Sequence, residues 1–329
     1  MLEQQSRQIN PPPEFLTGGR ILKYPKKLKA GDTIGLLCPS SPTKPEREEL
    51  CKAFVRDLGY KIKAADNLSA NFGGYMAGTG EVRGKWINAM FADPEVDAII
   101  CIKGGSSSSR AMEFLDLETI KKNPKIFVGY SDITNFHTVI NQFGGFVTFH
   151  GPMVSSNMLD NKFDEETKNS LFHALNADED YDLEKPANTD ISVIKPGKAR
   201  GILAGGCLSL LCASVGTPYE IDTRGKIIFL EDVNEDVYRI DRFASQLRDS
   251  GKFRDCAGVL LGQFADCKNR EKPEFTPVEC LADILKDANV PVISNVQSGH
   301  GFPMMTLPFG AECSIDTVTK TVRFHVDRS

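Results

Sequence analysis

The sequence predicts an α/β protein with two domains. The first is expected to hold a parallel sheet between two layers of helices. The second, smaller one is expected to be a β-rich α+β domain with a barrel-like form. The chain of 329 residues is longer than a typical single domain. In its first half, short apolar runs alternate with helical patterns, which is typical of a parallel sheet. In its second half, strand-like runs outnumber helical ones, which favours a domain built mainly of strands.

The first half shows the alternation clearly. Leu50, Phe54 and Leu58, for example, recur at the spacing that places them on one face of a helix. The predicted strands are residues 33–38, 60–64, 96–102, 126–128 and 146–149, and the predicted helices are residues 47–58, 80–91, 112–117 and a segment that starts near residue 133. Ligands of such sheets bind beyond the carboxyl ends of the strands, so the residues that follow these strands are candidates for a functional site.

An acidic and largely loop-like segment separates the two halves. It contains one helical pattern, residues 165–175. We expect four parts: an N-terminal extension (1–22), a first domain (23–160), an interdomain connection (161–189) and a second domain (190–329). The strand-like runs of the second domain are residues 191–194, 198–203, 227–230, 258–262, 290–293, 312–315 and 321–325, of which the last two form a hairpin-like pair.

Composition excludes several classes of protein. The net charge of −5 and the lack of a basic run with interleaved aromatic residues argue against a nucleic-acid partner. No apolar run approaches the ~18 residues of a membrane span, and the N-terminus lacks the apolar core of a secretion signal. Nine cysteines without a C-x-x-C motif favour free thiols in a reducing cytoplasm. Neither metal-ligand spacings nor phosphate-binding loops occur, so we expect no metal and no cofactor.

Ser131 lies at a sharp turn between a predicted strand and a predicted helix. Residues 126–128 are apolar, Gly129 follows them, and a helical pattern starts at Ile133. A serine at such a turn exposes its hydroxyl, and the first N–H groups of the helix favour a nearby negative charge, which is the geometry of a nucleophile. The alternative is that Ser131 only caps the helix, as Ser and Asp often do.

A nucleophilic serine needs a base, and the chain has five histidines. His300 lies in a glycine-flanked loop after a strand-like run, and such loops often carry functional groups. His150 also follows a strand-like run. Glu231 ends an apolar strand, where an unpaired carboxylate would be costly to bury, so Glu231 is the expected partner of the base. Asp232 is the next candidate for this acid.

Two glycines, Gly104 and Gly105, follow the apolar run 99–102. Glycine lets the backbone approach a tetrahedral intermediate and donate an N–H to its oxyanion, although a tight turn also needs glycine. Because this pair is expected at the same rim as Ser131, the oxyanion hole is the favoured interpretation. The serines at 106–109 are expected either to contact a ligand or to cap a helix.

Several short motifs together resemble a known family. They are residues 31–41, Lys-Gly-Gly at 103–105, Gly-Tyr-Ser-Asp at 129–132, His-Gly-Pro at 150–152, Gly-Gly at 205–206, Gly-Thr-Pro at 216–218, Phe-Leu-Glu-Asp at 229–232 and Gly-His-Gly at 299–301. In this order they resemble the LD-carboxypeptidases, serine peptidases of the muramoyl-tetrapeptide carboxypeptidase and microcin-C immunity type. The resemblance covers roughly residues 25–325. It implies Ser131 as nucleophile, His300 as base, Glu231 as the orienting acid, and the backbone N–H groups of Gly105 and Asp132 as the oxyanion hole.

The expected substrate contacts are Gly104, Ser106, His150, Cys207, Tyr238 and Arg239. Two of these depart from the family pattern, because Ser106 stands where a bulkier residue is usual and Cys207 stands where asparagine is common. Both changes predict a wider and less polar pocket, since a thiol is a poor hydrogen-bonding group. His150 is alternatively a structural histidine, and Tyr238 and Arg239 alternatively belong to a solvated helix face.

The resemblance implies a cytoplasmic serine carboxypeptidase or amidase that acts on a small peptide-like amide. The substrate is expected to be either a murein LD-peptide or a microcin-C-like aminoacyl nucleotide, and a homodimer is compatible with the family. The alternatives are a non-catalytic, two-domain peptide- or solute-binding protein and an esterase of the α/β-hydrolase type. The esterase is disfavoured because Ile133 occupies the last glycine position of its G-x-S-x-G turn.

Overall fold

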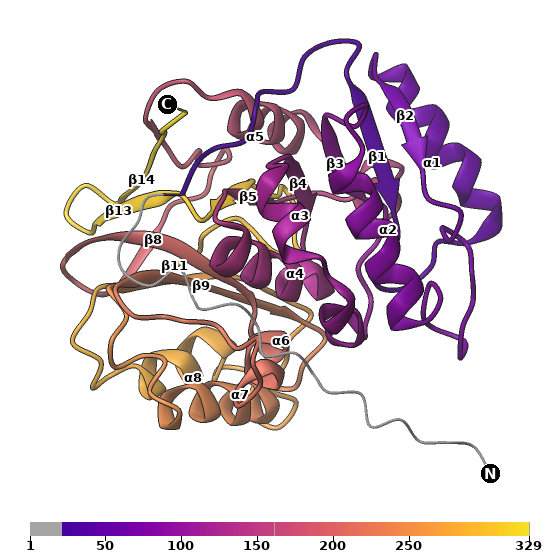
Figure 1. Ribbon diagram of the computed structural model, residues 1–329. Coiled ribbons are helices and arrows are strands. Elements are labelled where there is room, and N and C mark those ends of the chain that lie inside the picture. The colour runs from indigo at the N-terminus through magenta and orange to yellow at the C-terminus, as the bar shows by residue number, and fades with distance from the viewer. Residues whose placement is uncertain (1–21, 161, 329) are drawn as a thin grey trace.

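The computed structural model describes residues 22–160 and 162–328 (Figure 1). The predicted extension of residues 1–22 therefore lies, except for Leu22, outside the described residues. The structure confirms the predicted fold class, since an N-terminal, mostly parallel sheet is followed by a mixed, β-rich sheet. No helix in the described part of the chain is long and apolar enough to span a bilayer.

The first sheet has six strands in the order β12-β5-β4-β3-β1-β2. These strands are β1 (Thr33–Leu37), β2 (Lys61–Ala64), β3 (Ala98–Cys101), β4 (Ile126–Gly129), β5 (Thr148–His150) and β12 (Leu307–Phe309). All neighbours are parallel except β12, which pairs antiparallel with β5. Strand β12 was not predicted, and it brings a segment from the second half of the chain to the edge of the first sheet.

Helices and helical turns cover this sheet. They are α1 (Pro45–Asp57), α2 (Gly80–Ala92), η1 (Ser108–Phe114), α3 (Leu117–Lys122), η2 (Ser131–Ile133), α4 (Thr134–Val139), η3 (Ile140–Gly144), η4 (Val154–Met158) and α5 (Glu165–Asn176). The predicted helix at 112–117 was wrong in its extent. The 3₁₀ turn η1 ends at Phe114, and Asp116 then caps a new helix by accepting the Thr119 N–H at 2.9 Å.

The second sheet has eight strands in the order β6-β14-β13-β8-β9-β10-β11-β7. They are β6 (Tyr181–Asp182), β7 (Ser192–Lys195), β8 (Lys198–Cys207), β9 (Lys226–Val233), β10 (Gly258–Ala265), β11 (Val292–Ser294), β13 (Glu312–Asp316) and β14 (Thr321–His325). Strands β8, β9, β10 and β11 are parallel, so their carboxyl ends share one edge.

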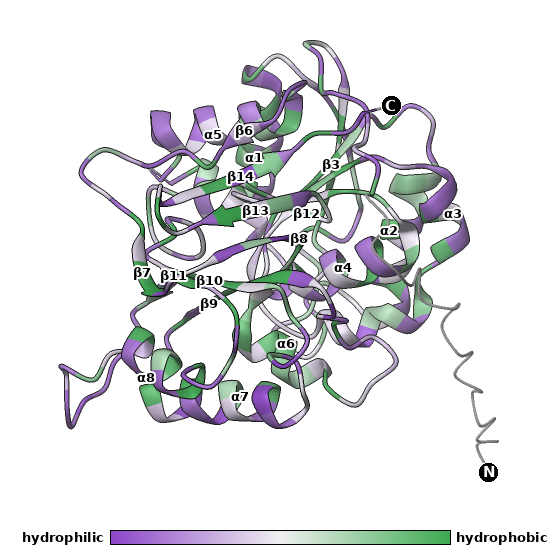
Figure 2. Cartoon of the chain, turned by 90° about the vertical axis from the view of Figure 1, so that its left-hand side faces the viewer, coloured by the Kyte–Doolittle hydropathy of each residue, from purple (hydrophilic) through white to green (hydrophobic). Residues whose placement is uncertain are grey.

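Three helices accompany the second sheet: α6 (Leu208–Ser214), α7 (Val237–Asp249) and α8 (Pro277–Ile284). Helix α7 buries Val237, Ile240, Ala244 and Leu247, which recur every three or four residues. Figure 2 shows the resulting hydrophobic and hydrophilic bands along α7, which lies beside α8. The apolar face of α7 therefore anchors it, and leaves its polar side toward solvent.

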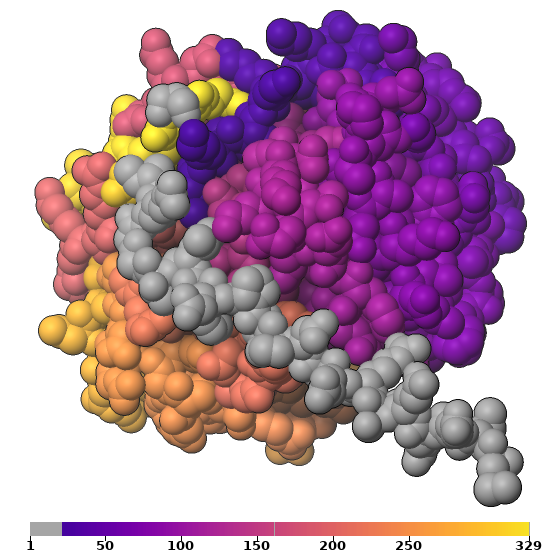
Figure 3. Space-filling model, in the orientation of Figure 1, coloured from indigo at the N-terminus to yellow at the C-terminus, as the bar shows by residue number. Residues whose placement is uncertain are grey.

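The two halves of the chain are packed against each other (Figure 3), and β8 contacts β12 of the first sheet and helix α4. The N–H of Cys207, the last residue of β8, donates to Oγ1 of Thr134 at the start of α4 at a distance of 3.0 Å. Gly206 has φ 129°, and a Cβ on it would lie 2.5 Å from the same oxygen. Only glycine therefore allows β8 to approach α4 this closely.

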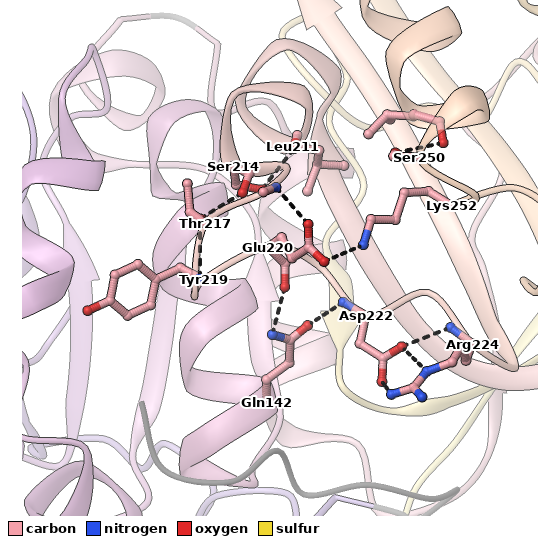
Figure 4. A network of polar contacts seen from close by, with 12 residues as sticks. Gln142, Leu211, Ser214, Thr217, Tyr219, Glu220, Asp222, Arg224, Ser250 and Lys252 are labelled. Atoms are coloured by element: carbon pink, nitrogen blue, oxygen red, sulfur yellow. Dashed lines mark hydrogen bonds and ion pairs between the residues drawn. The ribbon is translucent and has the colours of Figure 1, made fainter. Parts of the chain in front are cut away.

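Gln142 forms a second interdomain contact, which Figure 4 shows. Its Nε2 donates to the carbonyl oxygen of Glu220 at 3.1 Å, and its Oε1 accepts the N–H of Asp222 at 2.7 Å. The Glu220 carboxylate in turn lies 3.2 Å from Nζ of Lys252. One buried amide of the first domain thus holds a loop of the second domain through two backbone groups.

Candidate active site

Ser131 lies directly beyond β4, at the carboxyl edge of the first sheet. Its φ of 64° is in the left-handed region, which costs a non-glycine residue of order 1 kcal/mol and is common at active sites. His137 supports this turn, because its Nε2 lies 2.8 Å from the carbonyl oxygen of Gly129 and its Nδ1 lies 2.8 Å from Oγ1 of Thr148. A carbonyl can only accept, so Nε2 of His137 carries the proton. Burial lowers the pKa of His137 to about 4, which keeps it neutral.

The Gly104–Gly105 turn lies against Ser131. A Cβ on Gly104 would be 3.1 Å from Cβ of Ser131, and a Cβ on Gly105 (φ 121°) would be 2.0 Å from Oγ of Ser41. Ser41 holds the turn by donating its N–H to the carbonyl of Gly104 at 3.1 Å and accepting the Ser106 N–H at 3.3 Å. The structure thus brings Gly104, Gly105 and Ser131 together at one rim, and at Gly105 glycine is required by both space and φ.

Glu231 and His300 are joined by a hydrogen bond. Nδ1 of His300 lies 2.6 Å from Oε2 of Glu231, whose side chain is fully buried, whereas the His300 side chain is 14% exposed. Burial raises the pKa of Glu231, and the neighbouring His300 partly offsets this. Burial lowers the pKa of His300, but the charge and hydrogen bond of Glu231 outweigh it, so the net shift is upward.

Tyr130 brings these two parts together. It immediately precedes Ser131, and its ring centroid lies 4.8 Å from that of His300. The base-like histidine of the second domain therefore lies beside the serine turn of the first. The Ser131 hydroxyl makes no hydrogen bond to any residue that the structure describes, and such bonds are often long in enzymes without substrate. Since Glu231 occupies Nδ1, Nε2 of His300 is the ring atom left for proton exchange.

The side chain of Asp132 points away from this junction. It is buried and accepts the N–H of Ser108 at 2.8 Å and the Ser108 hydroxyl at 2.9 Å. Burial raises the pKa of Asp132, while these hydrogen bonds and Arg83 act in the opposite direction. The carboxylate thus ties the turn after Ser131 to the loop after Gly105, and only the backbone of Asp132 is available for an oxyanion.

Asp232, the other candidate acid, has different partners. Its carboxylate accepts the N–H groups of Ser209 and Val233, each at 2.8 Å, and Sγ of Cys207 at 3.4 Å. Cys207 is buried and lies opposite Glu231 in the β8–β9 pairing. Asp232 therefore secures the start of α6, and Glu231 is the carboxylate that contacts a histidine.

The remaining predicted contacts are spread over the surface and the interior. His150 is fully buried among Tyr130, Phe229 and Phe309, so its ring has no exposed atom that could touch a substrate. Ser106 is exposed beside the glycine turn, and Cys207 is buried.

Tyr238 and Arg239 lie on the first turn of α7. Tyr238 is 58% exposed, and its hydroxyl accepts Nε of Arg239 at 3.3 Å, while Arg239 also pairs with Glu235 at 3.6 Å. A surface cavity of about 490 Å³ lies here, and its lining includes Tyr238, Lys268 and Phe275. These contacts resemble the solvated helix face that was the alternative interpretation, and a substrate role stays a prediction.

Sequence reasoning missed four residues that build the site. Ser41, Tyr130, Thr134 and Asn157 position the glycine turn, the His300 ring and the domain contact. Ser41 and Tyr130 lie inside the motifs quoted above, so their place in the motifs was the available signal. Nothing in the local sequence indicated Thr134 or Asn157, because their partners are distant in the chain.

Comparisons with known proteins agree with this geometry. Residues 34–151 match the family model of the LD-carboxypeptidase N-terminal domain, and residues 200–315 match that of the LD-carboxypeptidase C-terminal domain. The chain is 39% identical over 298 residues to a probable murein peptide carboxypeptidase of Bacillus subtilis (strain 168), covering 90% of this chain and 92% of the relative.

Two solved structures are also similar. One is the microcin C7 self-immunity protein MccF in complex with aspartyl sulfamoyl adenosine. It has a TM-score of 0.82 and 25% identity, and the match covers 94% of this chain and 99% of that one. In the sequence comparison, the microcin C7 self-immunity protein MccF of Escherichia coli is 27% identical over 325 residues, which are 90% of this chain and 93% of the relative. The other is muramoyltetrapeptide carboxypeptidase from Oxalobacter formigenes, with a TM-score of 0.78, 25% identity and coverage of 90% and 99%. The two matched domains and the B. subtilis relative together establish that this chain belongs to the LD-carboxypeptidase family of serine peptidases.

Proposed function

We propose that the chain hydrolyses a small peptide-like amide through a triad of Ser131, His300 and Glu231. His300 accepts the hydroxyl proton of Ser131, which attacks the amide carbonyl. The backbone N–H groups of Gly105 and Asp132 stabilise the oxyanion, and each such donor is worth about 3–4 kcal/mol in comparable enzymes. His300 then protonates the leaving amine, and water releases the acyl group from Ser131.

One observation supports the proposal most strongly: the Glu231–His300 pair lies against the residue that precedes Ser131. A buried carboxylate that binds Nδ1 selects the tautomer with Nε2 free, which is what a general base for serine requires. The left-handed φ of Ser131 and the glycine turn beside it add the features of a nucleophile and of an oxyanion hole.

The Ser131 and Glu231–His300 parts belong to different sheets. Ser131 follows β4, whereas Glu231 lies in β9 near its carboxyl end and His300 follows β11. The proposed reaction therefore depends on the alignment of the two domains, which the contacts of Thr134 and Gln142 support.

The substrate proposal has two forms. The similar proteins are described as a murein peptide carboxypeptidase and as an immunity protein bound to an aminoacyl sulfamoyl nucleoside. Ser106 and Cys207, smaller or less polar than the family residues at these positions, favour a pocket that accepts more than a terminal D-amino acid. We therefore propose activity on amides with varied leaving groups.

A panel of substrates tests the proposal. The kcat/KM for a murein tetrapeptide is compared with that for an aminoacyl sulfamoyl adenosine. We expect turnover of both, and a preference above ~100-fold for the tetrapeptide, which is about 3 kcal/mol, would contradict the wide pocket. Binding of both compounds without any turnover would instead support the alternative of a non-catalytic binding protein.

A further inference from the structure

Tyr130 is a residue of the first domain that contacts the proposed base. Its ring centroid lies 4.8 Å from that of His300, and the two ring planes are inclined by 63°. The Tyr130 side chain is buried, and its hydroxyl accepts Nδ2 of Asn157 at 3.1 Å. Because Tyr130 directly precedes Ser131, one short segment carries both the proposed nucleophile and the ring that packs against the proposed base.

We propose that Tyr130 is a positioning residue that fixes the plane of the His300 imidazole with respect to Ser131. This inference rests on the proposed function, in which His300 is the base. Tyr130 itself is not a proton acceptor, because burial raises the pKa of its hydroxyl to about 12 and so keeps it neutral.

The backbone around His300 explains why the His300 ring needs this packing contact. His300 lies between Gly299, which has φ 128°, and Gly301, and glycine neighbours restrict a side chain little. Among residues 22–160 and 162–328, Glu231 alone forms a hydrogen bond to this ring, at Nδ1, and a single hydrogen bond permits rotation about the line that joins its two atoms. Contact with a second, buried ring removes this rotation, so Nε2 keeps one direction.

Tyr130 can fix the orientation of His300 only if the Tyr130 side chain is itself held in place. Asn157, which binds its hydroxyl, is fully buried and also accepts the Met153 N–H at 2.8 Å. The ring of His150 lies 5.9 Å from that of Tyr130, and its neighbour Phe309 packs at 5.1 Å from His150. The position of Tyr130 is thus fixed by polar and apolar contacts within the first domain and at its edge.

Loss of the Tyr130 ring should change the pKa of His300 in a defined direction. The titratable groups that face His300 are Glu231, Asp232, His150 and Tyr130. Burial lowers the pKa of His300, whereas Glu231 raises it. A smaller side chain at 130 admits water, which weakens the burial effect but also screens the Glu231 charge, and it lets the ring turn away from its Glu231 hydrogen bond. Because the upward effect of Glu231 is the larger one in the wild type, the pKa of His300 should fall from its raised value toward the ordinary 6.5.

The experiment compares Tyr130→Leu and Tyr130→Phe with Phe91→Leu. Phe91 is a matched control, because it is a fully buried ring that contacts Phe127 and Phe146 away from the site. The pKa of His300 is measured by NMR titration of its ring, with the signal assigned by its loss in His300→Asn, and kcat and KM are measured in parallel. If Tyr130→Leu does not fold, Tyr130→Met is measured in its place.

We expect Tyr130→Leu to lower the pKa of His300 toward 6.5 and to lower kcat roughly tenfold to hundredfold with KM within about threefold. Tyr130→Phe keeps the ring and should stay within about threefold of wild type in kcat, and Phe91→Leu should leave the His300 titration unchanged. An unchanged His300 pKa in Tyr130→Leu, or an equal shift in Phe91→Leu, would overturn the inference. The titration needs no turnover, so full activity of Ser131→Ala would refute the proposed function without deciding the role of Tyr130.

Discussion

Nδ1 of His300 lies 2.6 Å from Oε2 of Glu231, and this bond joins the end of β9 to the glycine-flanked loop after β11. The carboxylate is fully buried, and its second oxygen, Oε1, has no hydrogen-bond partner among the described residues. A buried carboxylate with a single partner is costly unless that partner is charged or strongly polarised. The pair is therefore better explained by a role in orienting the histidine than by stability.

Glu231→Gln is expected to lower kcat by at least ~100-fold, because an amide can present an N–H to Nδ1 and favour the wrong tautomer of His300. Glu312→Gln is the matched control, since Glu312 forms a surface pair with Arg200 at 2.7 Å and should be replaceable without effect on activity. Steady-state kinetics of both variants make the comparison. A Glu231→Gln enzyme within about threefold of wild type would remove Glu231 from the triad.

The pH dependence of kcat/KM should report the raised pKa of His300. Only neutral His300 can accept the Ser131 proton, so activity should increase with pH through a limb that lies above 6.5, the ordinary pKa of histidine. In Glu231→Gln the upward effect of the charge is lost and the burial effect remains, so the limb should move to lower pH. A wild-type limb at or below pH 6.5, or a limb that does not move in the variant, would be inconsistent with this assignment.

Gln142→Ala tests whether domain alignment controls activity. The variant leaves the Glu220 carbonyl and the Asp222 N–H without their partner, which should cost about 1–3 kcal/mol of stability. We also expect a fall of roughly tenfold in kcat/KM, because the nucleophile and base lie on different domains.

Asn88→Ala is the control for Gln142→Ala. Asn88 bridges the Phe114 carbonyl and the Asp116 N–H, each at 2.8 Å, entirely within the first domain. It should lose comparable stability in chemical denaturation but keep kcat/KM within about twofold. Equal losses of activity in both variants would mean that general loosening, not interdomain alignment, limits turnover.

The sequence predicted those features that short segments encode. The apolar strand before Gly129, the helical pattern from Ile133 and the glycines around His300 are local patterns, and the structure places them as a turn beyond β4 and a loop beyond β11. Glu231 was identifiable because a carboxylate at the end of an apolar strand needs a partner.

Features that depend on distant contacts were not predictable. Strand β12 has only three residues and contains Pro308. Proline disfavours a strand except at the edge of a sheet, and β12 lies at such an edge. His150 follows a strand as rim residues do, yet its ring is enclosed by Tyr130, Phe229 and Phe309. Its burial follows from the packing of both domains, which no local pattern records.

Activity is expected to be independent of metal ions. No group of three or more His, Cys, Asp or Glu side chains that could hold a metal occurs within residues 22–160 and 162–328, and the proposed mechanism uses only protein groups and water. Dialysis against a chelator should leave kcat unchanged. A loss of activity that zinc restores would require a different mechanism.

Ser131→Ala tests whether Ser131 is the nucleophile. The measurement is kcat/KM for the murein tetrapeptide or the aminoacyl sulfamoyl adenosine, whichever the wild-type enzyme cleaves faster. Ser131 is partly exposed on its turn, so the variant should fold, and Ser131→Gly, which suits the φ of 64°, serves as a second variant with less backbone strain. We expect a loss of at least ~10³-fold in kcat/KM in both variants with unchanged circular dichroism. Activity within about tenfold of wild type, only ~1.4 kcal/mol of barrier, would show that Ser131 is not the nucleophile.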